Sequence, residues 1–184
     1  MFNTALKYGG ISAIILGAAL LIPFLLLGDA TPDYALWEVI GWTSMIVGQV
    51  TIVFAMMAWR KANPDKAFPY MKAVGLGLMV SCIAALGFVV ADTFYITVVN
   101  PEFFNQYAEY EVEKMTAAGA SQADIEALMA EYAEMTGTAG VVFLETVMFI
   151  SVFLIGLVIS LISAAFLSRK QPQESEAAAH AVNI

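Results

Sequence analysis

Three acidic residues stand within or beside long apolar runs, where a charged side chain is costly. Glu38, Asp92 and Glu145 each have mostly apolar neighbours, and Gln49 adds a polar amide to the middle of one run. A charge in hydrocarbon costs about 2.5 to 3.5 kcal/mol on insertion scales. Carboxylates that converge can bind a cation or hold a proton. These four residues are therefore the candidate cation or proton site, although the sequence specifies no metal.

The same acids also have a purely structural interpretation. Acids at the outer ends of membrane helices cost little and can accept hydrogen bonds from free amides at a helix start. Glu38 and Glu145 suit that role, because both are expected in the first turn of a helix. Both interpretations stay open at this stage.

The elements that carry these acids are membrane helices. The chain has 184 residues, of which 60% are apolar and 13% charged, and its mean hydropathy is +0.78. A spanning helix needs about 20 mostly apolar residues. Runs of that length predict four spans, at residues 8–28, 37–59, 71–99 and 141–167. The first run could also be the core of a cleaved signal peptide, but it is longer than the ~7 to 15 residues of such a core.

The basic residues predict the orientation of these spans. All of them except Lys114 lie at span ends: Lys7, Arg60, Lys61, Lys66, Lys72, Arg169 and Lys170. The positive-inside rule then places both termini in the cytoplasm of a multi-pass inner-membrane protein. From each basic end, about 20 to 24 residues lead to an acid, Asp29, Glu38, Asp92 or Glu145, which is about one hydrocarbon thickness. All four acids are therefore expected at the outer boundary.

The insert at residues 100–138 holds half of the 16 acids and is expected to fold outside the cytoplasm as an amphipathic helical hairpin. Asn100 and Pro101 resemble a helix start, and Gly119 resembles a left-handed cap at its end. Ser121 and Asp124 resemble a capping box that begins a second helix. Apolar residues recur along that helix at Ile125, Leu128, Met129, Tyr132 and Met135.

Helical phase predicts which faces pack together. Glu145 shares a stripe with Val152, Gly156 and Ser163, Asp92 shares one with Ser81 and Ala85, and Glu38 shares one with Met45, Gln49 and Met56. Small residues recur at Gly77 and Ser81, at Ser44 and Gly48, and at Gly156 and Ser160, as at interfaces between membrane helices. The fold class is thus all-α: a four-helix transmembrane bundle over residues 1–170, with the hairpin between its third and fourth spans. A disordered cytoplasmic tail follows at residues 171–184.

Familiar catalytic motifs are missing from the sequence. It holds no glycine-rich phosphate loop, CxxC, HExxH or nucleophile elbow, and its single cysteine, Cys82, and single histidine, His180, are far apart. It also lacks a basic stripe for nucleic acid. We therefore expect no cofactor, no nucleic-acid partner and no enzymatic activity.

The chain resembles the bacterial membrane family catalogued as domain of unknown function 4199. The resemblance rests on "LKYGGISAIIL", "EVIGWTSMI", the insert "PEFFNQYAEYEVEKMTAAGASQADIEALMAEYAEM" and the closing helix "FLETVMFISVFLIGLVISLISAAFL". It implies four spans, an extracytoplasmic insert and acids at the positions of Glu38, Asp92 and Glu145. It implies no activity.

Two functions from different classes remain. The first is a non-enzymatic structural, accessory or partner-binding component in contact with the lipid bilayer, either as a homo-oligomer or with another membrane or extracytoplasmic protein. The second is a small cation- or proton-binding transporter or channel subunit that uses Glu38, Asp92, Glu145 and Gln49.

Overall fold

The computed structural model describes residues 1–27, 33–135 and 137–168, and within them all regular structure is helical. The helices are α1 (Phe2–Leu27), α2 (Tyr34–Gln49), α3 (Thr51–Ala62), α4 (Tyr70–Phe94), the π-helical turn η1 (Tyr95–Val99), α5 (Phe103–Ala117), α6 (Gln122–Met135) and α7 (Thr138–Leu167). Asp29, the basic pair at 169–170 and the predicted tail with His180 lie outside the described residues.

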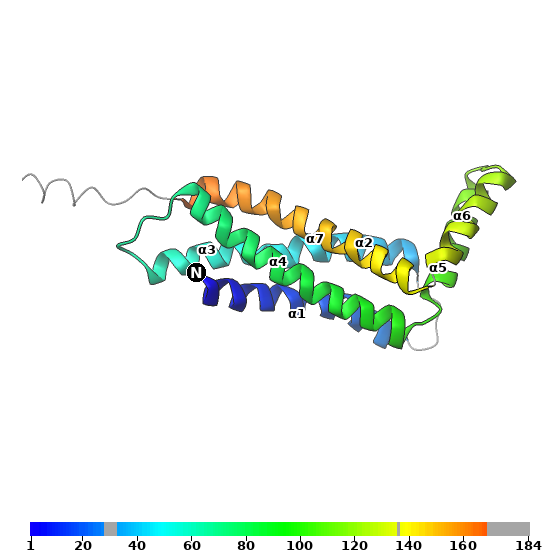
Figure 1. The fold of residues 1–184 in the computed structure, drawn as a ribbon, viewed down its shortest axis with the longest axis horizontal. Helices are drawn as coiled ribbons and strands as arrows, with labels where there is room; N and C mark the ends of the chain where they lie inside the picture. Colours follow the sequence, from blue (N-terminus) through cyan, green and yellow to red (C-terminus); the bar gives the residue numbers. More distant parts are fainter. Residues whose placement is uncertain (28–32, 136, 169–184) are drawn as a thin grey trace, which may run out of the picture.

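Four helical segments are long and apolar enough to cross a membrane: Phe2–Pro23, Tyr34–Ala62, Tyr70–Val99 and Thr138–Leu167. Their positions agree with the four predicted spans. The segments lie side by side in one elongated bundle, in which α4 packs extensively against both α1 and α7 (Figure 1). Many large apolar side chains on the outside of this bundle are exposed, as is usual for helices that face lipid.

Small residues bring α4 and α7 close together. A Cβ atom added at Gly77 would lie 2.7 Å from Ser160 Cβ, and one added at Gly156 would lie 2.5 Å from Ser81 Cβ. Each glycine therefore faces a serine of the other helix. The sequence predicts small residues at this interface, and the structure adds that the two pairs are reciprocal.

The second span is interrupted at Val50, between α2 and α3. Val50 keeps a helical backbone but its N–H bonds to Val47 O, 3.2 Å away, in the tighter i to i−3 pattern. The carbonyl of Gly48 accepts hydrogen bonds from Ser12 Oγ at 2.8 Å and from Thr51 Oγ1 at 2.9 Å. Side chains thus satisfy the backbone at the interruption.

The insert folds into two helices, α5 and α6, as predicted. Gly119 has a φ of +78°, so it is the left-handed residue between them. The hydroxyl of Ser121 accepts from the Asp124 N–H, which confirms Ser121 as the cap of the second helix, and it donates to the Asp124 carboxylate, which therefore bonds the hydroxyl and not the Ser121 N–H of a full capping box. Asn100 is not the helix cap, because α5 begins only at Phe103 after a turn closed by Phe103 N–H and Asn100 O.

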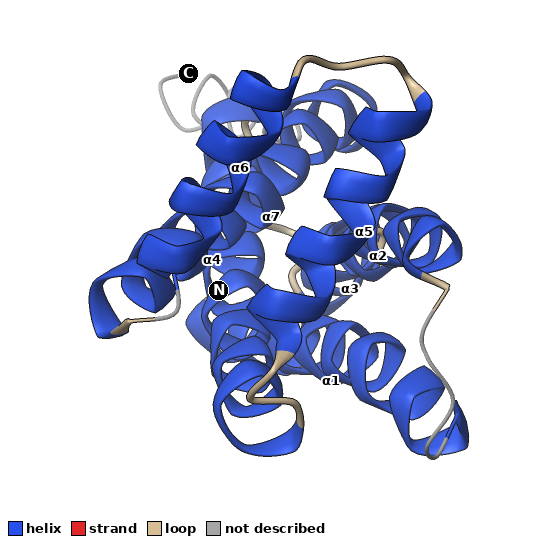
Figure 2. Ribbon diagram, turned by 90° about the vertical axis from the view of Figure 1, so that its right-hand side faces the viewer, coloured by secondary structure: helices blue, strands red, loops and turns tan. Residues whose placement is uncertain are grey.

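The two ends of the bundle differ. The start of α1, the connection between α3 and α4 and the end of α7 lie at one end, and the α5–α6 hairpin lies at the other (Figure 1). Seen from the hairpin end, α5 and α6 lie in front of the bundle helices (Figure 2). α6 has no buried residue, so the hairpin covers the bundle mainly through α5 and the last turns of α6.

Candidate functional site

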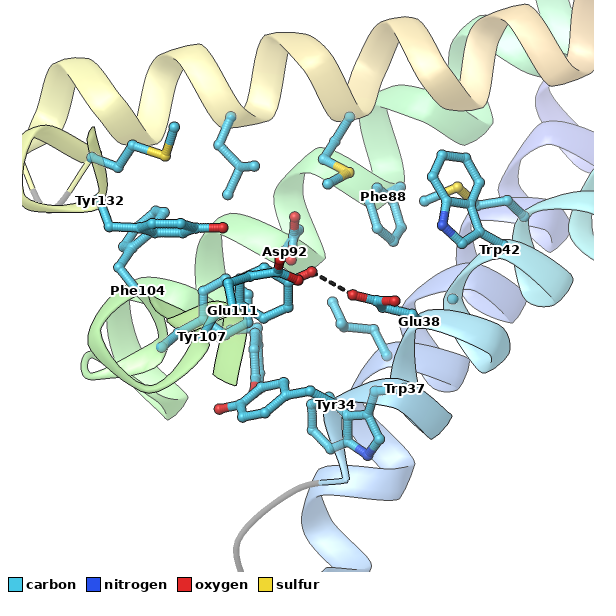
Figure 3. A pocket seen from close by; sticks show the side chains of 18 of the residues that line it. Tyr34, Trp37, Glu38, Trp42, Phe88, Asp92, Phe104, Tyr107, Glu111 and Tyr132 are labelled. Atoms are coloured by element: carbon cyan, nitrogen blue, oxygen red, sulfur yellow. Dashed lines mark hydrogen bonds between the residues drawn. The ribbon is translucent and has the colours of Figure 1, made fainter. Parts of the chain in front are cut away.

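A pocket of about 540 Å³ lies where the hairpin meets α2, α4 and α7. Figure 3 shows the side chains around it. Its lining is mostly aromatic and apolar, with three carboxylates and one ammonium group. The residues that line it include Leu20, Tyr34, Trp37, Glu38, Gly41, Trp42, Met45, Phe88, Asp92, Tyr95, Phe103, Phe104, Tyr107, Glu111, Lys114, Tyr132 and Met148.

Polar contacts attach α5 to the bundle beside this pocket. Tyr107 Oη donates to Glu38 Oε1 at 2.6 Å, which joins the middle of α5 to the start of α2 (Figure 3). Tyr34 Oη donates to Gln106 Oε1 at 2.9 Å, and Asn100 Nδ2 donates to the same oxygen at 3.0 Å. Asp33 caps α2 by accepting from the Leu36 N–H and so fixes where that helix begins.

Aromatic rings form the wall of the pocket on the hairpin side. Tyr107 stacks on Phe103 with ring centroids 5.7 Å apart and meets the edge of Tyr34 at 5.5 Å. Tyr132 of α6 lies 6.0 Å from Tyr107, and Tyr95 of η1 lies 5.8 Å from Phe103. Such ring pairs each add about 0.5 to 1.5 kcal/mol beyond the area they bury. The wall is therefore held by side-chain packing as well as by the hydrogen bonds.

Burial and the bond to Glu38 change the chemistry of Tyr107. Removal from water raises the pKa of this phenol well above its ordinary value of 10.0, and the Glu38 carboxylate raises it further. Tyr107 is thus a hydrogen-bond donor at every physiological pH.

Two of the three predicted acids lie in the pocket, and the third lies beside it. Glu38 and Asp92 both line the pocket, from α2 and α4. Glu145 lies close enough to Asp92 for electrostatic interaction but is not a lining residue. Asp92 and Glu145 are each 7% exposed, and both oxygens of Glu145 are buried without a hydrogen bond of good geometry, although the Thr93 side chain is nearby.

Glu145 is not in a first helical turn, in contrast to the expectation from sequence. α7 begins at Thr138, so Glu145 lies about two turns inside it. Free amides at the start of this helix therefore do not explain its position. Glu38 is the fifth residue of α2, so it also lies beyond the first turn, and Asp33 is the residue that caps this helix.

Gln49 lies apart from the three acids. Its Nε2 donates to Ser81 Oγ at 3.3 Å and to Val152 O at 3.2 Å, which links α2 to both α4 and α7. Its Oε1 is buried without a hydrogen-bond partner. The predicted set thus separates into Glu38 and Asp92 in the pocket, Glu145 behind Asp92, and Gln49 in the helix interface. In the described part of the chain, no three acidic, histidine or cysteine residues are grouped so that they could hold a metal ion.

Sequence reasoning missed the aromatic residues of the site and the pair Glu111 and Lys114. Lys114 Nζ lies 2.9 Å from Glu111 Oε1, and both side chains line the pocket. One signal was present: Tyr34, Trp37 and Glu38 fall on one face at the start of a span, and Phe103 and Tyr107 share a face of the insert. An aromatic group beside an acid at a span end indicates a site more strongly than the acid alone.

The described fold is an all-helical bundle with four helices of spanning length and composition, which is compatible with a multi-pass membrane protein. The chain belongs to the family described as protein of unknown function (DUF4199), whose model matches residues 7–169. This match confirms the resemblance found in the sequence. No curated protein and no solved structure matches the chain.

Proposed function

We propose that the protein is a non-enzymatic component of the inner membrane that binds a ligand or partner in the pocket beneath its α5–α6 hairpin. The pocket itself carries this proposal. Its volume of about 540 Å³ falls within the ~300 to 1,000 Å³ usual for ligand sites, and its lining combines apolar walls with a few polar groups.

The orientation of the chain is part of the proposal. Lys7, Arg60, Lys61 and Lys72 all belong to the bundle end that lies opposite the hairpin. The positive-inside rule supports a cytoplasmic location for that end and an extracytoplasmic one for the hairpin and pocket.

Cysteine labelling tests this orientation. Cys82→Ser removes the native thiol, and single cysteines are then introduced by Glu113→Cys in the hairpin and Lys66→Cys in the connection from α3 to α4. A membrane-impermeant maleimide should label intact cells at position 113, and at position 66 only after lysis. The reverse pattern would place the hairpin in the cytoplasm and refute the orientation.

Filling the pocket tests binding. Gly41 lines the pocket and has open space around it, so Gly41→Leu should occupy the cavity without disturbing the helices. Gly75→Leu is the matched control, because Gly75 is also surrounded by open space but is not a lining residue. A polar lipid extract should raise the melting temperature of the parent protein and of Gly75→Leu, but not of Gly41→Leu. Equal responses in all three would refute the pocket as the binding site.

One observation favours the second candidate, a small proton- or cation-binding transporter or channel subunit. Both oxygens of Glu145 are buried without a hydrogen bond of good geometry, with the Thr93 side chain nearby, and Asp92 is its neighbour. Proteoliposomes that enclose a pH-sensitive dye test this function. The parent protein should carry protons down a gradient, and Glu145→Gln should not. Equal flux in the two proteins, or flux no greater than in empty liposomes, would refute it.

A further inference from the structure

We propose that the ligand of this pocket is an organic cation: an ammonium group, primary or quaternary, attached to an apolar chain. The inference rests on the proposed ligand-binding function and specifies the chemical class that the site would take. Charge, aromatic content and the shape of the lining each support it.

The pocket has more negative than positive charge. Glu38, Asp92 and Glu111 line it, and Lys114 is the one basic residue in its lining. The Lys114 ammonium is already 2.9 Å from Glu111, and its side chain is 54% exposed. Lys114 also interacts electrostatically with Glu38, so one ammonium group faces three carboxylates in the described lining. A ligand cation would supply the missing charge in a partly dehydrated site.

The aromatic lining attracts the same class of ligand. Five aromatic residues line the pocket together with Glu38 and Asp92: Tyr34, Trp37, Tyr95, Phe103 and Tyr107. Figure 3 shows Tyr34, Trp37 and Tyr107 on one side of these two acids. The faces of aromatic rings attract ammonium groups by about 0.5 to 2 kcal/mol, and sites for quaternary ammonium ligands are built from such rings. The hairpin already contains one contact of this kind, with Lys114 Nζ 5.4 Å from the centre of the Tyr110 ring.

A bare metal ion fits the site poorly. The described residues offer no group of three metal-ligating side chains, and the cavity is far larger than an ion needs. An ammonium group requires no fixed coordination and can be held by two carboxylates and several rings.

The remaining lining accounts for an apolar chain. Leu20, Met45, Phe88 and Met148 continue the pocket toward the interior of the bundle. Trp42 also lines the pocket and is 57% exposed, so the cavity reaches the outer face of the bundle there. Two sources provide a cation on such a chain: a membrane lipid with an amine headgroup, or a hydrophobic cation that enters from the external water.

Quenching of tryptophan fluorescence by brominated ligands tests the inference. Trp42→Phe and Trp59→Phe leave Trp37 of the pocket as the reporter, and the protein is reconstituted in nanodiscs of a digalactosyl diacylglycerol, a neutral lipid without an amine. Three amphiphiles with the same brominated chain are compared: a trimethylammonium, a sulfate and a maltoside. We expect saturable quenching by the ammonium compound at concentrations at least about tenfold lower than by the other two.

Two charge variants and one matched control make the test specific. Glu38→Gln keeps an oxygen that can accept from Tyr107 and removes only the charge, and Asp92→Asn provides a second, independent variant. Each should weaken ammonium binding about tenfold. Glu113→Gln changes the net charge equally, but Glu113 is exposed and is not a lining residue, so binding should be unchanged.

The outcomes distinguish failure of the proposed cation specificity from failure of the proposed ligand-binding function. Equal saturable quenching by all three amphiphiles, unaffected by Glu38→Gln and Asp92→Asn, would overturn the cation and leave a pocket that binds apolar chains. Quenching that never saturates and is the same in Gly41→Leu would overturn the ligand-binding function itself. Brominated phosphatidylethanolamine in the disc distinguishes the sources. Stronger quenching than by the brominated form of the amine-free disc lipid identifies a lipid, and equal quenching identifies an external cation.

Discussion

Replacing Tyr107 by phenylalanine should loosen the hairpin without unfolding the bundle. The change removes the hydroxyl that donates to Glu38 at 2.6 Å and keeps the ring contacts with Phe103 and Tyr34. Hydrogen bonds to charged groups contribute about 1.5 to 3 kcal/mol. Glu38 is only half-buried, so the lower part of that range applies. We expect a loss of about 1.5 to 2 kcal/mol in hairpin docking, or about tenfold to thirtyfold more frequent opening.

Hydrogen exchange measured by mass spectrometry detects this opening. Amides of α5 should exchange about tenfold to thirtyfold faster in Tyr107→Phe, because local opening limits exchange in a weakly attached element. Amides of α1, which packs in the bundle, should not change. Tyr110→Phe is the matched control, since Tyr110 lies on the same helix and contributes ring contacts to Tyr34 and Tyr107.

A double-mutant cycle with Glu38→Ala assigns the effect to the bond. If the Tyr107 hydroxyl acts through Glu38, the two changes together should loosen the hairpin by clearly less than the sum of their separate effects. Exchange of α5 in Tyr107→Phe within twofold of the parent protein, or no faster than in Tyr110→Phe, would show that the rings alone hold the hairpin.

Three further predictions concern packing, the turn and pH. Gly77→Ala should reduce the free energy of unfolding by about 1 to 3 kcal/mol in a denaturing-detergent titration, because the new Cβ would overlap Ser160. Gly75→Ala, in open space, should not reduce it. Equal effects of the two substitutions would contradict the close approach of α4 and α7. Gly119→Ala should cost about 1 to 2 kcal/mol, measured as faster exchange in α6, since φ is +78° there, and unchanged exchange would contradict that conformation. The pKa of Tyr107 is higher in the folded protein than its ordinary value of 10.0. The stabilisation that the neutral hydroxyl provides is therefore complete below pH 10.0 and is lost as the pH rises through the pKa of the folded state. Protection of α5 in alkaline solution should therefore fall more steeply in the parent protein than in Tyr107→Phe, and parallel curves would contradict the shift.

The sequence predicts the bundle well because helical phase and small residues are local information. The stripes through Asp92, Gln49 and Glu145 are the buried faces of their helices. Gly119 and Ser121 act as predicted, since turn and cap preferences depend on a few adjacent residues. The interruption at Val50 is not predicted by the sequence, because Val50 itself is neither glycine nor proline. It is accompanied by hydrogen bonds from Ser12 and Thr51 to the Gly48 carbonyl.

The site is harder to predict than the bundle, because it depends on how the α5–α6 hairpin packs against the bundle helices. The acids of the candidate set were found by their cost in an apolar run, and Glu38 and Asp92 do share a pocket. The bond from Tyr107 to Glu38 joins residues far apart in the chain, and no periodicity of either segment encodes it. Helical phase predicts that Gln49 shares a face with Glu38, but the partners of Gln49 are Ser81 and Val152 in a helix interface.

The interruption at Val50 has a consequence for the order in which the membrane helices assemble. Within a bilayer, a carbonyl displaced from its regular helical bond needs another donor, since lipid tails supply none. The Gly48 carbonyl has two such donors: Thr51 lies in the same segment, and Ser12 lies in α1. The second segment can therefore enter the bilayer with this carbonyl already paired by Thr51, and the bond from Ser12 forms when the first segment docks beside it.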